Sequence, residues 1–275
     1  MRQQQRTLAL CADDFGQSPG ISRGIDKLAH AQRLNAVSVL ATHPHWPVAA
    51  ALTRAWPAEV DVGLHFNLSE GSPSSPELRA LWPRFPALPR LIAQAHLRQL
   101  PLPALAAEWQ AQLRAFMSAA KRTPDHIDGH QHVHHLPGVR EIVLDAAARL
   151  EPVPAVRNTG RVLGPGFAVK RRLIAQTGGV ALQRELMRRR WPHNPALLGV
   201  YDFVQADYRS LMQGWLRALP PEGGLLFCHP GETDVAGEPD AIAAARGREA
   251  AYLGSAQFAQ DLADAGVTLG RVWGA

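Results

Sequence analysis

The sequence predicts an α/β protein with a mainly parallel sheet. Short apolar runs rich in valine and leucine occur at 7–12, 36–40 and 60–66, each bounded by polar or turn-forming residues, as buried strands are. Segments with a helical spacing of apolar residues separate these runs, and the alternation returns later in the chain. Helices between successive strands indicate βαβ units, whose crossovers place the strands in parallel. The pattern alone leaves open whether the sheet closes into a barrel.

The elements alternate in order along the first quarter of the chain. After the strand at 7–12, Ile21, Ile25 and Leu28 recur at helical spacing and predict a helix over 21–34. The strand at 36–40, a helix over 47–56 and the strand at 60–66 follow. Residues 72–103 contain seven prolines, so we expect a loop excursion there.

The alternation resumes after this excursion, with one segment that the pattern does not resolve. Residues 158–200 combine glycine-rich turns with two basic helical stretches, and we describe them only as an insertion. The remaining predicted elements are helices at 105–119, 138–150, 208–219 and 249–265 and strands at 123–129, 155–157, 224–228 and 267–272.

Length and composition predict one domain over residues 1–275. Apolar residues make up 46% of the chain, which is enough for a sizeable core, and no run approaches the length of a membrane span. The N-terminus is polar, so we expect no secretory signal. Cys11 and Cys228 are the two cysteines and lie far apart in sequence, which excludes a disulfide framework and predicts a cytoplasmic protein.

The net charge of +5 comes almost entirely from arginine. The densest basic patches lie at 170–172 and 184–190, and the second has apolar residues between its charges. A solvated helix face is the favoured interpretation over an RNA or phosphate site, so we expect no nucleic-acid partner. A homodimer is compatible with the sequence.

Ionisable side chains gather where four of the predicted strands end. Asp13 and Asp14 follow the first strand, His65 ends the third, and His229 follows a later one. The segment 126–135 holds five of the twelve histidines. Because the carboxyl ends of parallel strands share one edge of a sheet, we expect these groups to converge.

Imidazole and carboxylate groups together favour a divalent metal ion. Adjacent carboxylates repel, so Asp13 and Asp14 need a cation or a shared proton between them. Strand alternation places His126, Asp128, His130 and His132 on one side, which makes His130 and His132 the best candidates, one for the metal and one for the substrate. Zn²⁺ is the ion that this donor set favours, with Mg²⁺ or another divalent ion as the alternative. A structural role for His65 and a solvated turn at 128–135 are the competing interpretations.

Four motifs in register resemble the YdjC/ChbG-type carbohydrate deacetylases, a group that includes HpnK-like proteins. They are Ala-Asp-Asp-Phe-Gly at 12–16, Gly-Leu-His-Phe-Asn-Leu-Ser-Glu-Gly at 63–71, His-Ile-Asp-Gly-His-Gln-His-Val-His at 126–134 and Cys-His-Pro-Gly-Glu at 228–232. The resemblance extends from about residue 7 to residue 272. It implies a TIM-barrel-like (β/α) barrel related to polysaccharide deacetylases, and a metal-dependent hydrolase that removes an N-acetyl group from a sugar such as a chitooligosaccharide.

The resemblance also implies roles for individual residues. Asp14, His65 and His130 match the family's metal ligands, Asp13 matches its general base and His229 its general acid. Phe66 stands where leucine is commoner, which is a packing change. The segment His43-Pro44-His45-Trp46 departs from the small residues usual after the second strand, so the choice of sugar is open.

Substrate contacts are expected from Phe15, His132, Arg157 and Trp82, with Trp46 as a further candidate for stacking on a sugar ring. We also expect the segment 72–103 to form a wall or lid over the site, because long loops in compact domains are usually functional. Two other classes of function remain: a metal-dependent phosphoesterase, and a nonenzymatic metal-binding or RNA-binding protein.

Overall fold

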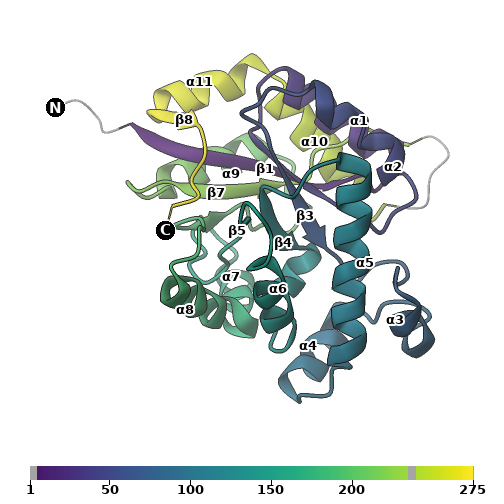
Figure 1. The fold of residues 1–275 in the computed structure, drawn as a ribbon. Coiled ribbons are helices and arrows are strands. Elements are labelled where there is room, and N and C mark those ends of the chain that lie inside the picture. The colour runs from purple at the N-terminus through teal and green to yellow at the C-terminus, as the bar shows by residue number, and fades with distance from the viewer. Residues whose placement is uncertain (1–4, 235–239, 275) are drawn as a thin grey trace.

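The molecule is built around one curled sheet of parallel strands, as the computed structural model shows over residues 5–234 and 240–274 (Figure 1). The order of strands in the sheet is β5-β4-β3-β2-β1-β7-β6, with β8 paired to β1, and the pairings between these strands are all parallel. The strands are β1 (Arg6–Phe15), β2 (Ala36–Val39), β3 (Asp61–Phe66), β4 (His126–Gly129), β5 (Ala155–Val156), β6 (Leu197–Leu198), β7 (Gly224–Cys228) and β8 (Val267–Leu269).

Curling of the sheet brings distant strands face to face. In a flat sheet β1 and β5 would lie roughly 19 Å apart, four strand spacings. Nevertheless, Arg157, directly after β5, bonds to Asp13 of β1. Bridges from Val156 to His193 and from Val162 to Leu197 connect the segments at the two edges of the sheet. The prediction of a TIM-barrel-like α/β fold is confirmed, in the form of a half-barrel whose edges are joined by irregular segments.

The helices cover the outside of this sheet (Figure 1). In α1, Ser18 accepts a hydrogen bond from the Ile21 N–H and Pro19 occupies the first turn, so the sequence itself defines the start of the helix. The helices are α1 (Pro19–His30), α2 (Trp46–Ala49), α3 (Pro76–Leu81), α4 (Leu88–His96), α5 (Leu102–Ala120), α6 (Val139–Ala147), α7 (Ala168–Ile174), α8 (Val180–Arg189), α9 (Tyr208–Ala218), α10 (Ala243–Leu253) and α11 (Ala256–Asp264). Short turns of other helix types are η1 (Leu52–Ala55), η2 (His130–His135) and η3 (Ala175–Gly179). Among the residues described, no helix is both long and apolar enough to cross a membrane.

Three predicted elements were wrong. The helix predicted over 47–56 is the short helix α2 followed by the separate 3₁₀ turn η1. The excursion at 72–103 contains the helices α3 and α4, because Pro76 and Pro89 lie in the first turns of helices, where a missing N–H costs nothing. The single helix predicted over 249–265 is two helices. Ser255 begins the second one by accepting a hydrogen bond from the Phe258 N–H. Residues 158–200, for which the sequence pattern predicted no elements, form α7, η3, α8 and β6.

Candidate metal centre and active site

The two adjacent aspartates at the end of β1 face different partners. The register of β1 with β2 shifts between Ala12 and Phe15, and Asp14 adopts a left-handed backbone with φ of 68°. Aspartate tolerates this conformation better than most residues. The two carboxylates are therefore held by different cations, although they belong to neighbouring residues.

Asp14 lies at the centre of a group of positive or potentially positive side chains. Its Oδ1 is 3.1 Å from His130 Nδ1 and 3.6 Å from His65 Nε2, and its Oδ2 accepts a hydrogen bond from Arg246 Nη2 at 2.9 Å. Burial would raise the pKa of Asp14, but Arg246 and His130 outweigh it and hold the pKa well below its usual range. Asp14 is thus an ionised carboxylate.

His65 is oriented by Asp128 on the neighbouring strand β4. Its Nδ1 lies 2.6 Å from Asp128 Oδ1, and Ser38 Oγ donates to the other carboxylate oxygen at 2.6 Å. The Asp128 carboxylate accepts a hydrogen bond from the Nδ1–H of His65, so the lone pair of His65 Nε2 faces Asp14. A carboxylate that fixes the tautomer of an imidazole in this way is the usual support of a metal-ligating histidine.

His130 reaches the site from a turn and not from a strand. Strand β4 ends at Gly129, and His130 begins η2, in which Gln131 and His132 have left-handed backbones. Its Nε2 lies 3.0 Å from Oε2 of Glu70, whose other oxygen accepts a hydrogen bond from Gln17. Burial lowers the pKa of His130, but Asp14 and Glu70 outweigh this effect and raise it to about 10. The two carboxylates around His130 therefore stabilise positive charge at this position.

The donor atoms of Asp14, His65 and His130 all lie within 4.8 Å of one another. One carboxylate and two imidazoles fit a divalent ion such as Zn²⁺, which leaves further coordination positions for water or substrate. The structure therefore brings together the three residues that the sequence singled out.

Asp13 is held by a buried arginine. Arg157 donates from Nη1 to Asp13 Oδ2 at 2.7 Å and from Nη2 to Oδ1 at 2.6 Å, and it also forms an ion pair with Asp128. Asp13 Oδ2 lies 4.0 Å from His65 Nε2, so this carboxylate adjoins the candidate metal centre. Arg157 is fully buried, a position that does not favour the predicted contact with a sugar.

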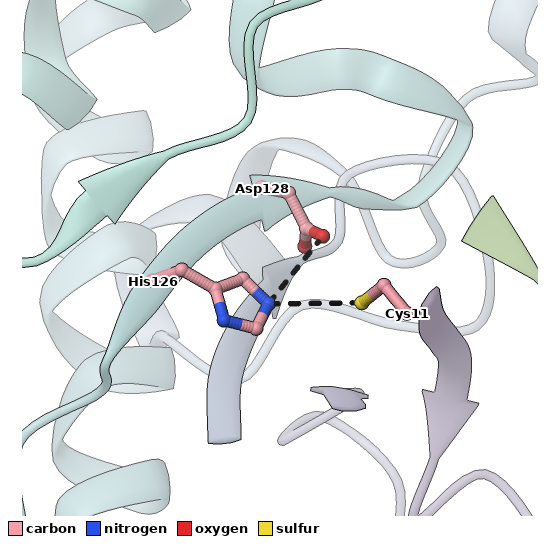
Figure 2. Close-up of side chains that lie close together, drawn as sticks. All are labelled: Cys11, His126 and Asp128. Atoms are coloured by element: carbon pink, nitrogen blue, oxygen red, sulfur yellow. Dashed lines mark hydrogen bonds and ion pairs between the residues drawn. The ribbon is translucent and has the colours of Figure 1, made fainter. Parts of the chain in front are cut away.

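A second group of potential metal ligands is formed by Cys11, His126 and Asp128 (Figure 2). His126 Nε2 lies 3.9 Å from both Cys11 Sγ and Asp128 Oδ2. Arg157 Nη2 lies 3.2 Å from the same sulfur and pairs with the same carboxylate, so a guanidinium already supplies the positive charge here. Burial raises the pKa of the Cys11 thiol well above its usual value, and a protonated thiol is a poor metal ligand.

The ring of His126 occupies the space beside Gly63 of β3. A Cβ atom at position 63 would lie 2.3 Å from Cδ2 and Nε2 of this ring. His126 Nε2 is also 3.0 Å from Ser38 Oγ, and the ring stacks on Trp273. His126 thus packs beneath the site and supports Asp128 through their shared contact with Ser38.

His229 follows β7 and forms another wall of the site. Its ring packs edge-on against Phe203 and Phe227, and its backbone N–H donates to Glu249 Oε2 at 2.5 Å. Burial lowers the pKa of the His229 ring to about 4, despite the opposing effects of Asp14 and Asp13. The ring is therefore neutral near pH 7, with a buried Nδ1 that makes no hydrogen bond within the described structure.

The expected aromatic contacts to a sugar lie mostly in the core. Phe15 and Trp46 are buried and pack edge-on against each other, which does not favour contact with a substrate. Trp82 is partly buried at the end of α3 and packs on the core. His132 is partly buried between Phe227 and His135, and burial lowers the pKa of its ring well below the usual value.

Four residues at or beside the candidate site escaped assignment from the sequence. Asp128 and Glu70 stand inside the recognised motifs, so their types and positions were visible but their partners were not. Arg246 and Glu249 come from α10, where an arginine and a glutamate look like any solvated helix residues. Their burial is produced by tertiary packing, which leaves no local signal.

The fold and the site together define an α/β half-barrel protein with a candidate divalent-metal centre at the carboxyl ends of its strands. A family model described as YdjC-like protein matches residues 7–264, so the chain belongs to this family and the predicted resemblance is confirmed.

Similar proteins were found by sequence and by structure. The chain is 34% identical over 163 residues to a mouse protein named carbohydrate deacetylase, covering 56% of this chain and 52% of the relative. It is 33% identical over 151 residues to a chitooligosaccharide deacetylase of Enterobacter, covering 52% of this chain and 56% of that protein. The chain thus spans about half the length of these curated relatives.

A crystal structure from Enterococcus faecalis matches the fold as a whole. That protein carries a provisional assignment to cellobiose-phosphate cleavage. It is 22% identical to this chain, with a TM-score of 0.73 and coverage of 98% of both chains. The likeness shows that the half-barrel is a recurring arrangement.

Proposed function

We propose that this chain is a metal-dependent hydrolase that removes the N-acetyl group from an N-acetylated sugar such as a chitooligosaccharide. The observation that carries the proposal is the group formed by Asp14, His65 and His130 beside the separately held carboxylate of Asp13. The names of the mouse and Enterobacter relatives support the reaction class.

Asp14, His65 and His130 would hold the ion, and Zn²⁺ is the ion that this donor set favours over Mg²⁺. When bound, a divalent ion polarises the acetyl oxygen and makes water a stronger nucleophile. Asp14 is committed to this group and to Arg246, whereas Asp13 faces His65 Nε2 from the other side. Asp13 is therefore the base that takes a proton from the attacking water.

Arg157 keeps Asp13 in one orientation. Two parallel hydrogen bonds occupy one lone pair on each carboxylate oxygen and leave others free to accept a proton. Orientation matters because a general base must lie within hydrogen-bond distance of the proton that it removes. We therefore propose a positioning role for Arg157 in place of the predicted sugar contact.

His229 delivers the proton that the leaving amine needs. Its ring is neutral in the free site, so it takes up this proton from solvent inside the complex, while Asp13 keeps the proton that it accepts from water until the product leaves. Negative charge that develops on the substrate raises the proton affinity of a neighbouring ring.

Two parts of the chain form the substrate wall. One is His132, whose Nδ1 is buried without a hydrogen bond in the described structure. The other is the segment from Gly71 through α3 and α4. This segment begins directly after Glu70, which contacts His130. Trp82 at the end of α3 remains our candidate for stacking on a sugar ring.

A phosphoesterase is less well supported because the arginines at the site are already paired. Arg157 bonds to Asp13 and Arg246 to Asp14, so their charges are neutralised and are not available to bind a phosphate.

Both cysteines are free and buried, which supports a reducing, cytoplasmic location.

One assay separates the function classes. The purified protein is incubated with N-acetylated glucosamine oligomers and with phosphate esters, before and after treatment with a chelator. Release of acetate that stops after chelation and returns with Zn²⁺ is the expected result. Release of phosphate would favour the phosphoesterase, and inactivity on both panels would favour a nonenzymatic role.

A further inference from the structure

The segment 168–190 concentrates the positive charge of the chain. It contains seven of the 29 lysines and arginines and one of the 24 acidic residues, a net charge of +6, whereas the rest of the chain has a net charge of −1. The segment forms α7, η3 and α8, which lie together at one edge of the molecule (Figure 1). The net positive charge of the chain therefore comes from one segment, part of which forms an exposed surface.

This surface also exposes apolar side chains. Val169 is 84% exposed, Leu173 55% and Met187 62%, and α7 has no buried residue at all. Within α7 and within α8, the exposed positions recur at three- and four-residue intervals, which place them on one face of each helix. We call this surface the basic face, defined by the residues Val169, Arg172, Leu173, Val180, Arg184, Met187 and Arg188.

Several of the charges on and beside the basic face are free to meet a partner. Arg172, Arg184 and Arg190 are exposed and form no ion pair with any residue that the structure describes. The single acidic residue, Glu185, pairs with Arg188 and Arg189. An exposed mixture of cationic and apolar side chains without unpaired acids is complementary to an anionic, partly apolar partner.

The opposite side of the segment is fixed to the histidine turn. His135 Nε2 lies 3.0 Å from Thr177 Oγ1, and a Cβ at Gly178 would lie 2.1 Å from the His135 carbonyl oxygen. Lys170 Nζ turns inward, bonds to the Tyr201 carbonyl and lies 4.9 Å from the ring of Phe203. Phe203 in turn packs on His229, so the side of the segment opposite the basic face is connected to a wall of the candidate active site.

We propose that the basic face docks this protein on the surface of an anionic lipid membrane. Arginine charges attract acidic headgroups, and Val169, Leu173 and Met187 insert beside them, as in helices that lie in the plane of a membrane. An RNA partner would leave these apolar tips without a role. A second copy of the chain would bring two surfaces of +6 together. The proposal is independent of the chemistry proposed above.

Vesicle sedimentation tests the proposal on the whole protein. Wild type should bind vesicles of phosphatidylcholine with phosphatidylglycerol, and should not bind phosphatidylcholine alone. The double variant Arg172→Glu/Arg184→Glu should lower the partition coefficient at least about 30-fold, since each basic residue near the surface contributes about fivefold. Val169→Ser/Leu173→Ser should lower it about tenfold by removing the apolar contact.

Matched controls keep the result specific. Arg90→Glu/Arg114→Glu makes the same change in net charge at exposed arginines of α4 and α5, and Val48→Ser removes an exposed apolar side chain of α2. Both should bind like wild type. The proposal is wrong if wild type ignores anionic vesicles, or if the arginine control loses as much binding. Two further results would contradict the proposal. In the first, Val169→Ser/Leu173→Ser binds vesicles like wild type, and a uridine oligonucleotide binds the basic face as tightly as the vesicles do. In the second, light scattering shows a dimer of the wild type that this variant abolishes.

Discussion

Arg157 and Asp13 are joined by two parallel hydrogen bonds across the interior of the half-barrel, although their strands are separated by three others in the sheet. Arg157 also pairs with Asp128, which orients His65. One guanidinium therefore connects the carboxylate proposed as base with the support of a proposed metal ligand.

Arg157→Met should destabilise the protein by about 3–5 kcal/mol, because it leaves two buried carboxylates without their cation. Urea unfolding monitored by circular dichroism measures this change. Arg161→Met removes an exposed ion pair with Glu222 and should cost no more than about 1 kcal/mol. Equal losses in the two variants would contradict the importance of the buried pair.

His65→Ala should remove most of the bound metal, because one of three protein ligands is lost and Asp14 no longer faces an imidazole lone pair. Elemental analysis of the purified proteins provides the measurement. His96→Ala, on the exposed end of α4, is the matched control and should retain metal as wild type does. Equal metal content in the two variants would refute the assignment of the ligand.

The two aspartates should separate metal binding from proton transfer. Asp13→Asn should keep its metal and lose about 10²- to 10⁴-fold in amide hydrolysis, because asparagine keeps the shape but cannot accept the proton. Asp14→Asn should lose the metal itself. If the metal contents show the reverse order, the roles of the two neighbours are exchanged, and Asp14 becomes the base.

His229→Ala should slow the hydrolysis of an N-acetyl sugar about 10²- to 10⁴-fold with metal content unchanged. An O-acetyl ester with a good leaving group needs less protonation, so the variant should recover part of its activity on that substrate. Asp13→Asn should show no such recovery. Equal losses on amide and ester would exclude His229 as the acid and leave it a structural role beside Phe203 and Phe227.

Glu249→Gln should stabilise the protein at alkaline pH. Burial raises the pKa of Glu249 to about 7 from 4.5, against the effects of Tyr201, the His229 N–H and Arg246, and Asp13 adds to the rise. The folded state then holds a proton that the unfolded state has lost, so stability contributed by this group is full below pH 4.5 and is lost as the pH rises to about 7.

The variant and wild type should therefore unfold alike near pH 4.5, and the variant should be more stable by about 3 kcal/mol at pH 8. Urea unfolding at the two pH values measures the difference, and effects of other titrating groups cancel in the comparison. Glu77→Gln, exposed on α3, should change nothing. A constant difference between pH 4.5 and pH 8 would contradict the raised pKa.

The sequence predicted where the candidate site lies because parallel strands deliver their ends to a common edge of the sheet. Asp14 and His65 follow that rule directly. Alternation along a strand explained His126 and Asp128, which both contact Ser38. It failed for His130 and His132, because β4 ends at Gly129 and the left-handed turn that follows redirects each side chain separately.

Proline was the other source of error. Counted as a breaker, it indicated a loop over 72–103, whereas Pro76 and Pro89 lie in the first turns of helices. The sequence shows the type of residue but not whether its N–H is needed. Whether the N–H is needed depends on where the helix begins. In α3 the helix begins after Ser75, so the missing N–H of Pro76 lies in the first turn.

Gly63 and His126 belong to motifs 63 residues apart, but they share one volume in the folded chain. The ring of His126 occupies the space that a side chain at position 63 would fill. A larger residue at position 63 is thus tolerated only with a smaller residue at position 126. That smaller residue would lose the contact between His126 and Ser38. The two positions are expected to vary as a pair among relatives, so that a larger residue on β3 accompanies a smaller one on β4.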